Sequence, residues 1–272
     1  NVPGSFAQQL ELVITRMYNQ ITVHLWKMIY ESDVKNLFRD LRQLYLLDGD
    51  IFPIWLANGA LKTLQTNTSL FFDAVGDLNR QYQRMERQFD CFDEVVVLSD
   101  ATTNQLSNSS YIHPYEQLFD QISRMRQQWH DSIRLNIQIK WPLCILVSDE
   151  ILEIYNQIWQ FLLLVKRIQM ELNDCYMTIL KQKNSDNKMQ QRVHMVMNFI
   201  VDHIWYFLGV DVIDSQFSQF EQFLRKCESY QACRVQHEQL LMKIHKSMFL
   251  GKSGQVVKST LVKLLDIILV YA

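Results

Sequence analysis

Two short stretches of the sequence place polar side chains at a spacing that could serve catalysis. "HEQLL" at residues 237–241 begins like the metal-binding helix of a zinc protease, and "LGKSG" at residues 250–254 looks like part of a phosphate-binding loop. The zinc motif needs a second His four residues after the first, and Leu241 occupies that position. The phosphate loop needs a Gly five residues before its Gly-Lys pair, where Lys246 stands. Neither stretch therefore predicts the chemistry that it resembles.

The cysteines and histidines also fail to form a metal set. Cys227 and Cys233 are six residues apart, which is wrong for a zinc knuckle. His194 and His203 are nine residues apart, so a helix would place them on different flanks. Five cysteines without the spacing of a disulfide framework are typical of a reducing cytosol. We expect no catalytic residues, no metal and no cofactor, and hence a protein that is not an enzyme.

The composition favours a helical protein. The 272 residues are 48% hydrophobic, which is enough to fill a core, while only 7 Gly and 4 Pro are present to form turns. A net charge of −2 leaves no overall positive field for binding nucleic acid. The longest apolar runs end at charged residues before they reach the length of a membrane span. We therefore expect a soluble chain, and its start at Asn1 without a signal pattern suggests a piece of a longer protein.

Apolar residues recur at helical spacing along most of the chain. The clearest stripes run from Phe6 to Met28, from Val34 to Tyr45 and from Ile151 to Ile179. The stripe that begins at Ile151 is so wide that its helix must be buried on more than one side. We also expect helices near 52–65, 70–89 and 114–130, a loop at 99–114, a helix from Val193 that ends near Gly209, a shorter one from Asp214, and a last one from Gln255 to Tyr271.

One stretch has the period of a strand instead. Isoleucine and leucine alternate with polar residues over 133–139, and after Trp141 and Pro142 a second apolar run covers 143–147. The predicted fold class is therefore all-α, with stacked helical bundles and a small β-hairpin-like insert near 133–147. We expect one domain over residues 1–272, with two packed sub-bundles as a possible subdivision, at 1–131 and 148–272.

Three stretches, taken together, resemble a known family. They are "ESDVKNLFRDLRQLYLLDGDIF" at 31–52, "IQIKWPLCILVSDEILEIYNQIWQFLLLVKRIQMELNDCY" at 137–176 and "VDHIWYFLGVDVIDSQFSQFEQFL" at 201–224. In this order, and followed by "HEQLLMKIHKSMFL" and a last apolar helix, they resemble the C-terminal half of the γ-tubulin complex proteins, the Grip-motif family. The resemblance covers nearly the whole chain. In this family the Trp-Pro segment is a small extended element between bundles, and we expect Trp141 to wedge under the neighbouring helices.

The resemblance implies a function without catalytic groups. It implies a helical scaffold subunit of the γ-tubulin ring complex, which holds γ-tubulin and helps to template microtubule nucleation. The partners that it implies are γ-tubulin and, mainly through an N-terminal half, other γ-tubulin complex proteins. The implied location is the cytoplasm and cytoskeleton, at the centrosome or another microtubule-organising centre and at the spindle. Two alternatives stay open at this point: a helical adaptor or tether of another cytosolic assembly, and an enzyme with a helical cleft.

Two groups of residues are candidates for contact with γ-tubulin. The family has a Gly-Asp-Phe turn where this chain reads "DGDIF", and its helix near 201–208 carries Asn-Leu-Gln-Tyr-Tyr where this chain reads "HIWYF". Aromatic residues and charged residues at such positions are typical anchors of protein interfaces. The candidate contacts are Tyr45, Asp50, Phe52 and Trp55 in the first group, and Arg192, Phe199, His203 and Asp211 in the second.

Overall fold

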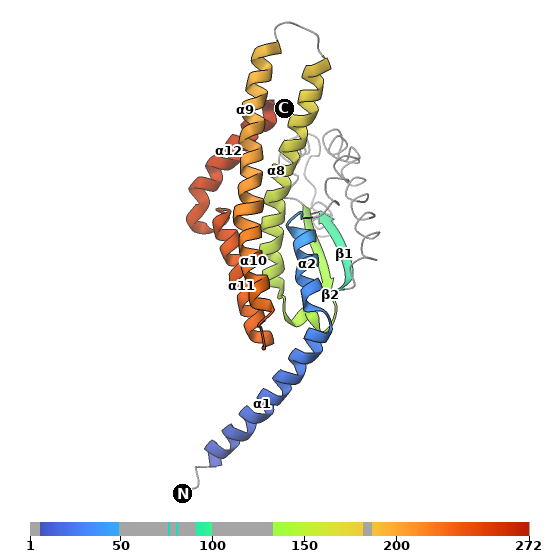
Figure 1. Ribbon diagram of the computed structural model, residues 1–272, viewed down its shortest axis with the longest axis vertical. Coiled ribbons are helices and arrows are strands. Elements are labelled where there is room, and N and C mark those ends of the chain that lie inside the picture. The colour runs from blue at the N-terminus through green and yellow to red at the C-terminus, as the bar shows by residue number, and fades with distance from the viewer. Residues whose placement is uncertain are drawn as a thin grey trace, which may run out of the picture.

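The computed structural model describes residues 6–48, 76, 80, 91–99, 133–181 and 187–271. Within this part of the chain, helices surround one long central helix, and a two-stranded sheet lies on one side of it (Figure 1). The predicted class, all-α with a small antiparallel β element, is confirmed. The predicted helices near 52–65, 70–89 and 114–130, and all of the predicted loop except its first residue, lie essentially outside the described residues.

The central helix is α8, Asp149–Lys181. It begins after Ser148, whose carbonyl accepts hydrogen bonds from the backbone N–H groups of Ile151 and Leu152, and acidic Asp149 and Glu150 fill its first turn. Acidic side chains there are stabilised by the positive end of the helix dipole. α8 contacts α2, the sheet, α9, α11 and α12, so the prediction that this helix is buried on more than one side is confirmed.

The chain after α8 forms the helical side of the molecule. The elements are α9 (Asn187–Tyr206), η4 (Phe207–Asp214), α10 (Ser215–Leu224), α11 (Tyr230–Ser247), the short turn η5 (Lys252–Gly254) and α12 (Gln255–Tyr271). α9 packs along α8, while α11 and α12 cover its lower and middle parts (Figure 1).

The predicted helix end near Gly209 is wrong. The backbone continues from α9 through a π-helical segment, η4, into α10 without a break. Leu208, Val212 and Ile213 of η4 are buried. Burying one such side chain stabilises the fold by about 1.5–3 kcal/mol, whereas Gly in a helix costs about 1 kcal/mol. Tertiary packing therefore outweighs the local tendency of Gly209 to end the helix.

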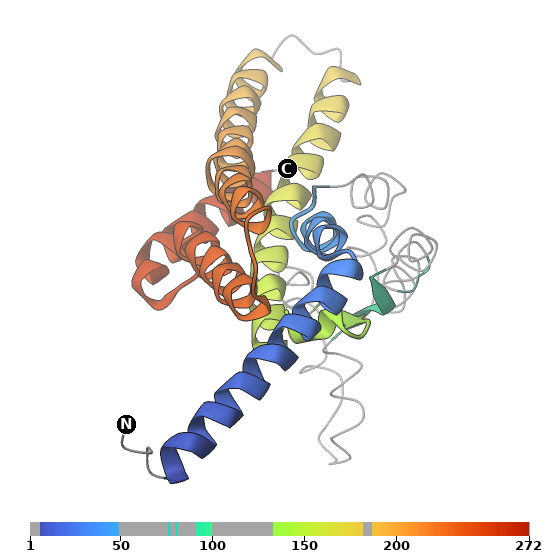
Figure 2. The ribbon, with the colours of Figure 1, turned by 60° about the horizontal axis from the view of Figure 1, so that its bottom comes forward.

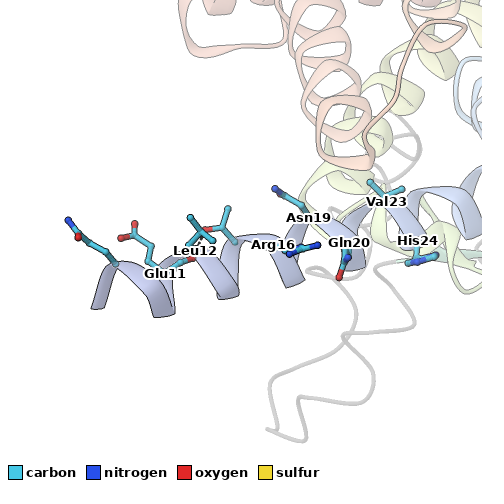
Figure 3. Close-up of a pocket in the computed structure, with 9 residues that line it drawn as sticks. Glu11, Leu12, Arg16, Asn19, Gln20, Val23 and His24 are labelled. Atoms are coloured by element: carbon cyan, nitrogen blue, oxygen red, sulfur yellow. Dashed lines mark hydrogen bonds between the residues drawn. The ribbon is translucent and has the colours of Figure 1, made fainter. Parts of the chain in front are cut away.

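The N-terminal helices are α1, Phe6–Glu31, and α2, Val34–Tyr45. Asp33 joins them in the left-handed conformation, at φ 66°, which lets the chain change direction. The apolar stripe of α2 is buried as predicted, but α1 projects from the body (Figures 1 and 2). Among the side chains of α1 whose burial is described, from residue 8 on, only Trp26 and Ile29 are buried. A shallow hollow along α1 is lined by side chains of this single helix, such as Glu11, Arg16 and His24 (Figure 3).

The sheet consists of β1, Phe92–Ser99, and β2, Ile133–Ile139, paired antiparallel with Val95 opposite Ile137. Alternate residues of β2 are buried and exposed, which confirms the strand predicted at 133–139. The second strand predicted at 143–147 is wrong, because Leu143–Ile145 is a 3-10 turn and the partner strand comes from far earlier in the chain. The expectation that Trp141 lies under the neighbouring helices is also wrong, because its side chain is 67% exposed. Pro142 and Leu143 are buried instead.

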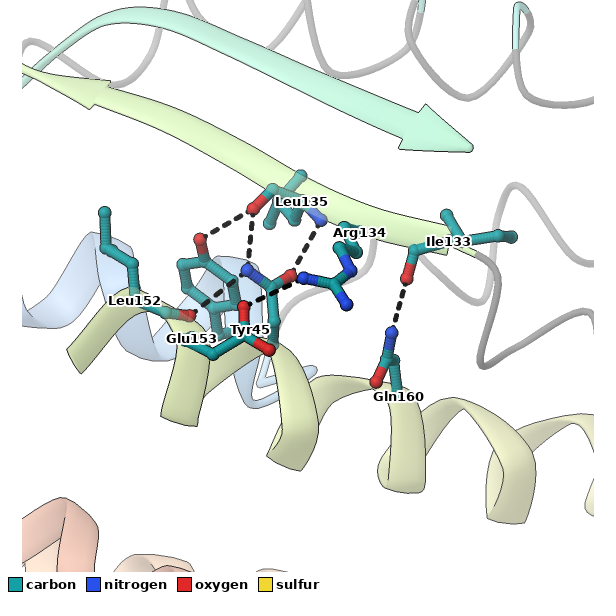
Figure 4. A network of polar contacts seen from close by, with 8 residues as sticks. Tyr45, Ile133, Arg134, Leu135, Leu152, Glu153 and Gln160 are labelled. Atoms are coloured by element: carbon teal, nitrogen blue, oxygen red, sulfur yellow. Dashed lines mark hydrogen bonds and ion pairs between the residues drawn. The ribbon is translucent and has the colours of Figure 1, made fainter. Parts of the chain in front are cut away.

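The free edge of β2 is paired by side chains of α8 (Figure 4). Asn156 accepts a hydrogen bond from the backbone N–H of Leu135 at 2.8 Å and donates one to the Leu135 carbonyl at 3.1 Å. Gln160 donates to the carbonyl of Ile133 at 2.9 Å. An unpaired strand edge must be satisfied when it is buried. α8 therefore takes the place that a neighbouring strand would have.

Tyr155 and His237 form a polar pair inside the core between α8 and α11. Both side chains are fully buried, and the Tyr155 hydroxyl lies 2.9 Å from Nε2 of His237. The ring of Phe38 lies 4.6 Å from the imidazole. Burial disfavours the charged imidazolium and lowers the pKa of His237 to about 3. His237 is therefore a neutral core residue.

His237 gives the stability of the protein a pH dependence. Below pH 6.5 the unfolded chain binds a proton at this residue and the folded chain does not, so the free energy of unfolding falls as the pH is lowered from about 6.5 to about 3. The slope from this group is about 1.4 kcal/mol per pH unit. We expect urea unfolding of wild type and His237→Gln at several pH values to show this difference in slope. Parallel pH profiles would contradict the neutral state of His237.

Candidate partner-binding face

One side of α9 faces α8 and the other is open. His194 and Val201 on the inner side are buried, and Tyr176 of α8 stacks on His194 with ring centroids 5.1 Å apart. The exposed residues of the opposite side recur three or four positions apart, so they form one continuous stripe. We call this stripe the outer face: Arg192, Met195, Val196, Phe199, His203, Tyr206 and Val210.

The outer face exposes several large apolar side chains. Met195, Phe199 and Tyr206 are each 61% exposed, and Val196 is 59% exposed. An aromatic side chain buries about 150–250 Å² when it is covered. Scattered apolar residues are normal on protein surfaces, but a contiguous patch of them marks a binding site. The outer face is therefore a candidate binding surface.

Charged residues lie at the two ends of this patch. Arg192 is exposed near the start of α9, and Asp211 is exposed in η4, 19 positions later. Within the described residues neither forms an ion pair. At about 1.5 Å per residue they lie about 28 Å apart along the helix. An apolar centre with a polar rim is the usual anatomy of a protein–protein interface, and here the rim has opposite charges at its ends.

His203 is held against the centre of the patch. Its Nδ1 lies 2.8 Å from the carbonyl oxygen of Phe199, and its ring centroid lies 3.9 Å from that of Phe199. Because the two residues are four positions apart, they are neighbours on the helix surface. The pair forms a single aromatic ridge on the outer face.

A polar network fixes α9 to α8 behind the outer face. Asp202 accepts hydrogen bonds from Gln169 of α8 at 2.9 Å and from Asn198 at 2.8 Å. The ammonium group of Lys166 lies 4.7 Å from the centre of the Trp205 ring. Burial lowers the pKa of Lys166, and the nearby carboxylate of Asp202 opposes this shift. The outer face is therefore presented by a helix with a fixed orientation.

Arg42 connects the lower end of this helix to α2. Its Nη2 lies 2.7 Å from Oδ1 of Asp214, at the end of η4, and its Nε lies 2.8 Å from Oδ2 of Asp48. The guanidinium also lies over the ring of Phe217, 5.4 Å from its centre. π-helical segments are frequent at functional sites, and this one carries Asp211. Arg42 thereby holds the η4 end of the outer face against α2.

The residues predicted from the sequence divide into three groups. Arg192, Phe199 and His203 share the outer face, and Asp211 is exposed beyond its lower end. Tyr45 is fully buried, where its hydroxyl donates to the Leu135 carbonyl at 3.0 Å and its ring stacks on Tyr155. It is a core residue and has no surface to offer a partner. Asp50, Phe52 and Trp55 lie outside the described residues.

Sequence reasoning missed the apolar half of the outer face. Methionines at helical spacing, as around Met195, are more often core than surface, and Tyr206 was not among the candidate contacts. The spacing from Phe199 was a usable signal, because Met195 and Tyr206 lie four residues before it and seven after it. Trp205, in contrast, is half-buried beneath Lys166 and does not belong to the outer face.

The helix that carries the outer face is also unusually apolar. The continuous helical segment from Lys188 to Leu224 could cross a membrane by length and composition alone, and only 22% of its most apolar window is buried. The expectation that no stretch reaches membrane length fails for this segment, because its few charges are spread along a longer helix than the sequence suggested. The same exposure gives the outer face its apolar surface.

Among the described residues, no three His, Cys, Asp or Glu side chains are grouped so as to hold a metal ion. The cysteines of this part of the chain are free thiols, and burial raises the pKa of Cys233 to about 12. A thiol with that pKa is a poor nucleophile. The outer face is the candidate site because it is the exposed apolar stripe of α9.

Comparison with known proteins gives a separate result. A family model described as "Gamma tubulin complex component C-terminal" matches residues 59–272, which include the whole outer face. Two relatives named "Gamma-tubulin complex component 4", from Homo sapiens and Mus musculus, are each 27% identical over 262 residues, covering 88% of this chain and 37% of theirs. A "Gamma-tubulin complex component 4 homolog" from Medicago truncatula is 21% identical over 271 residues, covering 84% and 36%. This chain spans little more than a third of the length of these relatives.

Proposed function

The chain belongs to the gamma-tubulin complex component C-terminal family, and from this membership we propose that it is a non-catalytic scaffold that binds γ-tubulin through its outer face. The relatives are named as components of the γ-tubulin complex. We propose the same assembly for this protein, with γ-tubulin and other γ-tubulin complex proteins as its partners. Its proposed place is the cytoplasm and cytoskeleton, at microtubule-organising centres such as the centrosome and at the spindle.

The observation that carries this proposal is the exposed apolar stripe of α9. Met195, Phe199 and Tyr206 form its centre, and Arg192 supplies a charged end. A stable interface buries roughly 800 Å² on each partner and depends on a few aromatic or Arg anchors. The outer face offers both kinds of anchor on a helix that the Asp202 network holds in place.

The mechanism that we propose is multivalent presentation. Free tubulin dimers lose translational and rotational freedom at every step that builds a new microtubule nucleus. A scaffold that holds γ-tubulin molecules side by side raises their effective concentration, so the first lateral contacts form within one assembly. Such a scaffold needs a rigid body and a binding face and no catalytic group. A single domain over residues 1–272, with sub-bundles at 1–131 and 148–272, is the organisation that we propose for this body.

Arg192→Glu tests the charged end of the outer face. The residue is exposed, so the fold should be unchanged, while γ-tubulin capture should weaken about three- to tenfold and depend less on salt. Lys243→Glu on α11 is the matched control, because it reverses an exposed charge away from the outer face. Equal capture by both variants in a pull-down with purified γ-tubulin would show that Arg192 is not part of the interface.

Because the helical segment from Lys188 to Leu224 is apolar, a membrane is the alternative partner of the outer face. Vesicle flotation of the wild-type chain and of a Phe199 variant distinguishes the two partners. We expect the wild-type chain to stay with the protein fraction when it is floated with vesicles of phosphatidylcholine and phosphatidylserine. Co-flotation that is lost when Phe199 is replaced by Asp would assign the outer face to a lipid surface instead of γ-tubulin.

A further inference from the structure

A second concave surface lies between α2 and α10 and shares no residue with the outer face. It is a groove of about 410 Å³, which is within the range of about 300–1,000 Å³ that is usual for binding pockets. The basic and aromatic residues that line the groove are Lys35, Arg39 and Arg42 from α2 and Phe217, Phe220 and Arg225 from α10 and its C-terminal end.

The floor of the groove is aromatic and rigid. The rings of Phe38 and Phe220 meet edge to face with centroids 4.9 Å apart, and both side chains are buried. Phe217 continues the floor toward one end, beneath the guanidinium of Arg42. The ion pair of Arg42 with Asp214, at 2.7 Å, joins α2 to the start of α10 at that end. The two helices therefore keep their spacing without a ligand.

On the rim of the groove, the basic side chains that are available to a ligand outnumber the acidic ones. Lys35, Arg39 and Arg42 lie at positions i, i+4 and i+7 of α2, so they line one side of the helix. Arg42 is committed to Asp48 and Asp214.

Lys35 and Arg225 form no ion pair in the described part of the chain. The side chain of Arg39 is 61% exposed, although its Nε lies 3.5 Å from the buried Asp40. The carboxylate of Asp33 accepts a hydrogen bond from Asn36. Asp33 and Glu221 are then left as the acidic residues of the rim against these three cations.

We propose that this groove binds an acidic peptide segment of a protein partner, with a bulky apolar side chain next to its carboxylates. The aromatic floor receives the apolar side chain, and the cations of the rim pair with the carboxylates. Lys35 and Arg39 are about 6 Å apart along the helix axis. Side chains on the same face of an extended peptide are two residues, or about 6.6 Å, apart. The segment that fits is therefore an acid-x-acid sequence followed by an apolar residue.

The test uses the 272-residue chain and the fluorescein-labelled peptide GSEAELFGS, with GSQAQLFGS as the uncharged control. Fluorescence anisotropy should show binding of the Glu peptide that weakens as NaCl rises from about 50 to about 300 mM. The double variant Arg39→Gln, Arg225→Gln should bind it at least about tenfold more weakly. Lys263→Gln, an exposed change on α12 away from the groove, should bind like wild type.

Three results would overturn the proposal. They are no binding of the Glu peptide by wild type, equal binding of the two peptides, and equal affinity of the double variant and wild type, each with unchanged circular dichroism. Displacement of the peptide by phosphatidylserine vesicles, but not by a soluble acidic peptide, would also overturn it in favour of a lipid surface. Capture of γ-tubulin is scored separately, since this groove and the outer face have no residue in common.

Discussion

Replacing Phe199 by Asp is expected to weaken γ-tubulin binding by about 30-fold or more. Phe199 lies at the centre of the outer face, 61% exposed and stacked on His203. Central aromatic anchors of interfaces contribute at least about 2 kcal/mol when truncated, and each 1.4 kcal/mol is about tenfold in affinity. A buried carboxylate without a partner adds a desolvation cost in the complex. Affinity measured with purified γ-tubulin is the readout.

The fold should tolerate this change. An exposed Asp in a helix interior costs about 0.7 kcal/mol or less, so circular dichroism and the thermal midpoint should be nearly unchanged. Val256→Asp is the matched control, because Val256 is 79% exposed on α12 and does not belong to the outer face. If Phe199→Asp binds γ-tubulin as tightly as Val256→Asp does, the outer face is not the contact surface.

Replacing Asn156 by Leu is expected to lower the free energy of unfolding by about 2–3 kcal/mol. The two side chains have the same branching at Cγ and the same number of heavy atoms, so the main effect is polar. The buried N–H of Leu135 loses its acceptor at 2.8 Å, and an unsatisfied buried group costs about 1–3 kcal/mol. The Leu135 carbonyl keeps the hydroxyl of Tyr45 at 3.0 Å, which limits the loss on that side. Urea unfolding measures the change.

Asn198→Leu on α9 is the control for Asn156→Leu. Asn198 donates one exposed hydrogen bond, to Asp202 on the same helix, and its loss should cost less than about 1 kcal/mol. Equal destabilisation by the two changes would mean that Asn156 does not pair the edge of β2.

The helices were predictable because their signal is local. The stripe of α8 repeats over about eight turns, and the acids of its first turn and Ser148 before them mark where the helix begins. The sheet was half predictable for the same reason. The alternation over β2 lies within the strand. Its partner β1 ends 34 positions before β2 begins, and pairing over that distance leaves no local pattern in the sequence. The apolar run at 143–147 was the nearest candidate and was wrong.

The candidate site shows where the sequence stops being informative. Arg192, Phe199 and His203 share a face because helical spacing requires it. Whether that face is covered depends on where α8 and α12 pack, which periodicity along α9 cannot tell. Tyr45 was predicted as a contact because it is aromatic and near a turn, yet α8 and the sheet enclose it. The exposure of Met195 and Tyr206 became visible only with the tertiary structure.

We propose that this chain presents a rigid apolar face that holds γ-tubulin. Mixing the purified 272-residue chain with purified γ-tubulin, and measuring complex formation by isothermal titration or mass photometry at micromolar concentrations, tests it directly. We expect a one-to-one complex for wild type that is lost in Phe199→Asp. A folded wild-type chain that forms no complex at these concentrations would contradict it.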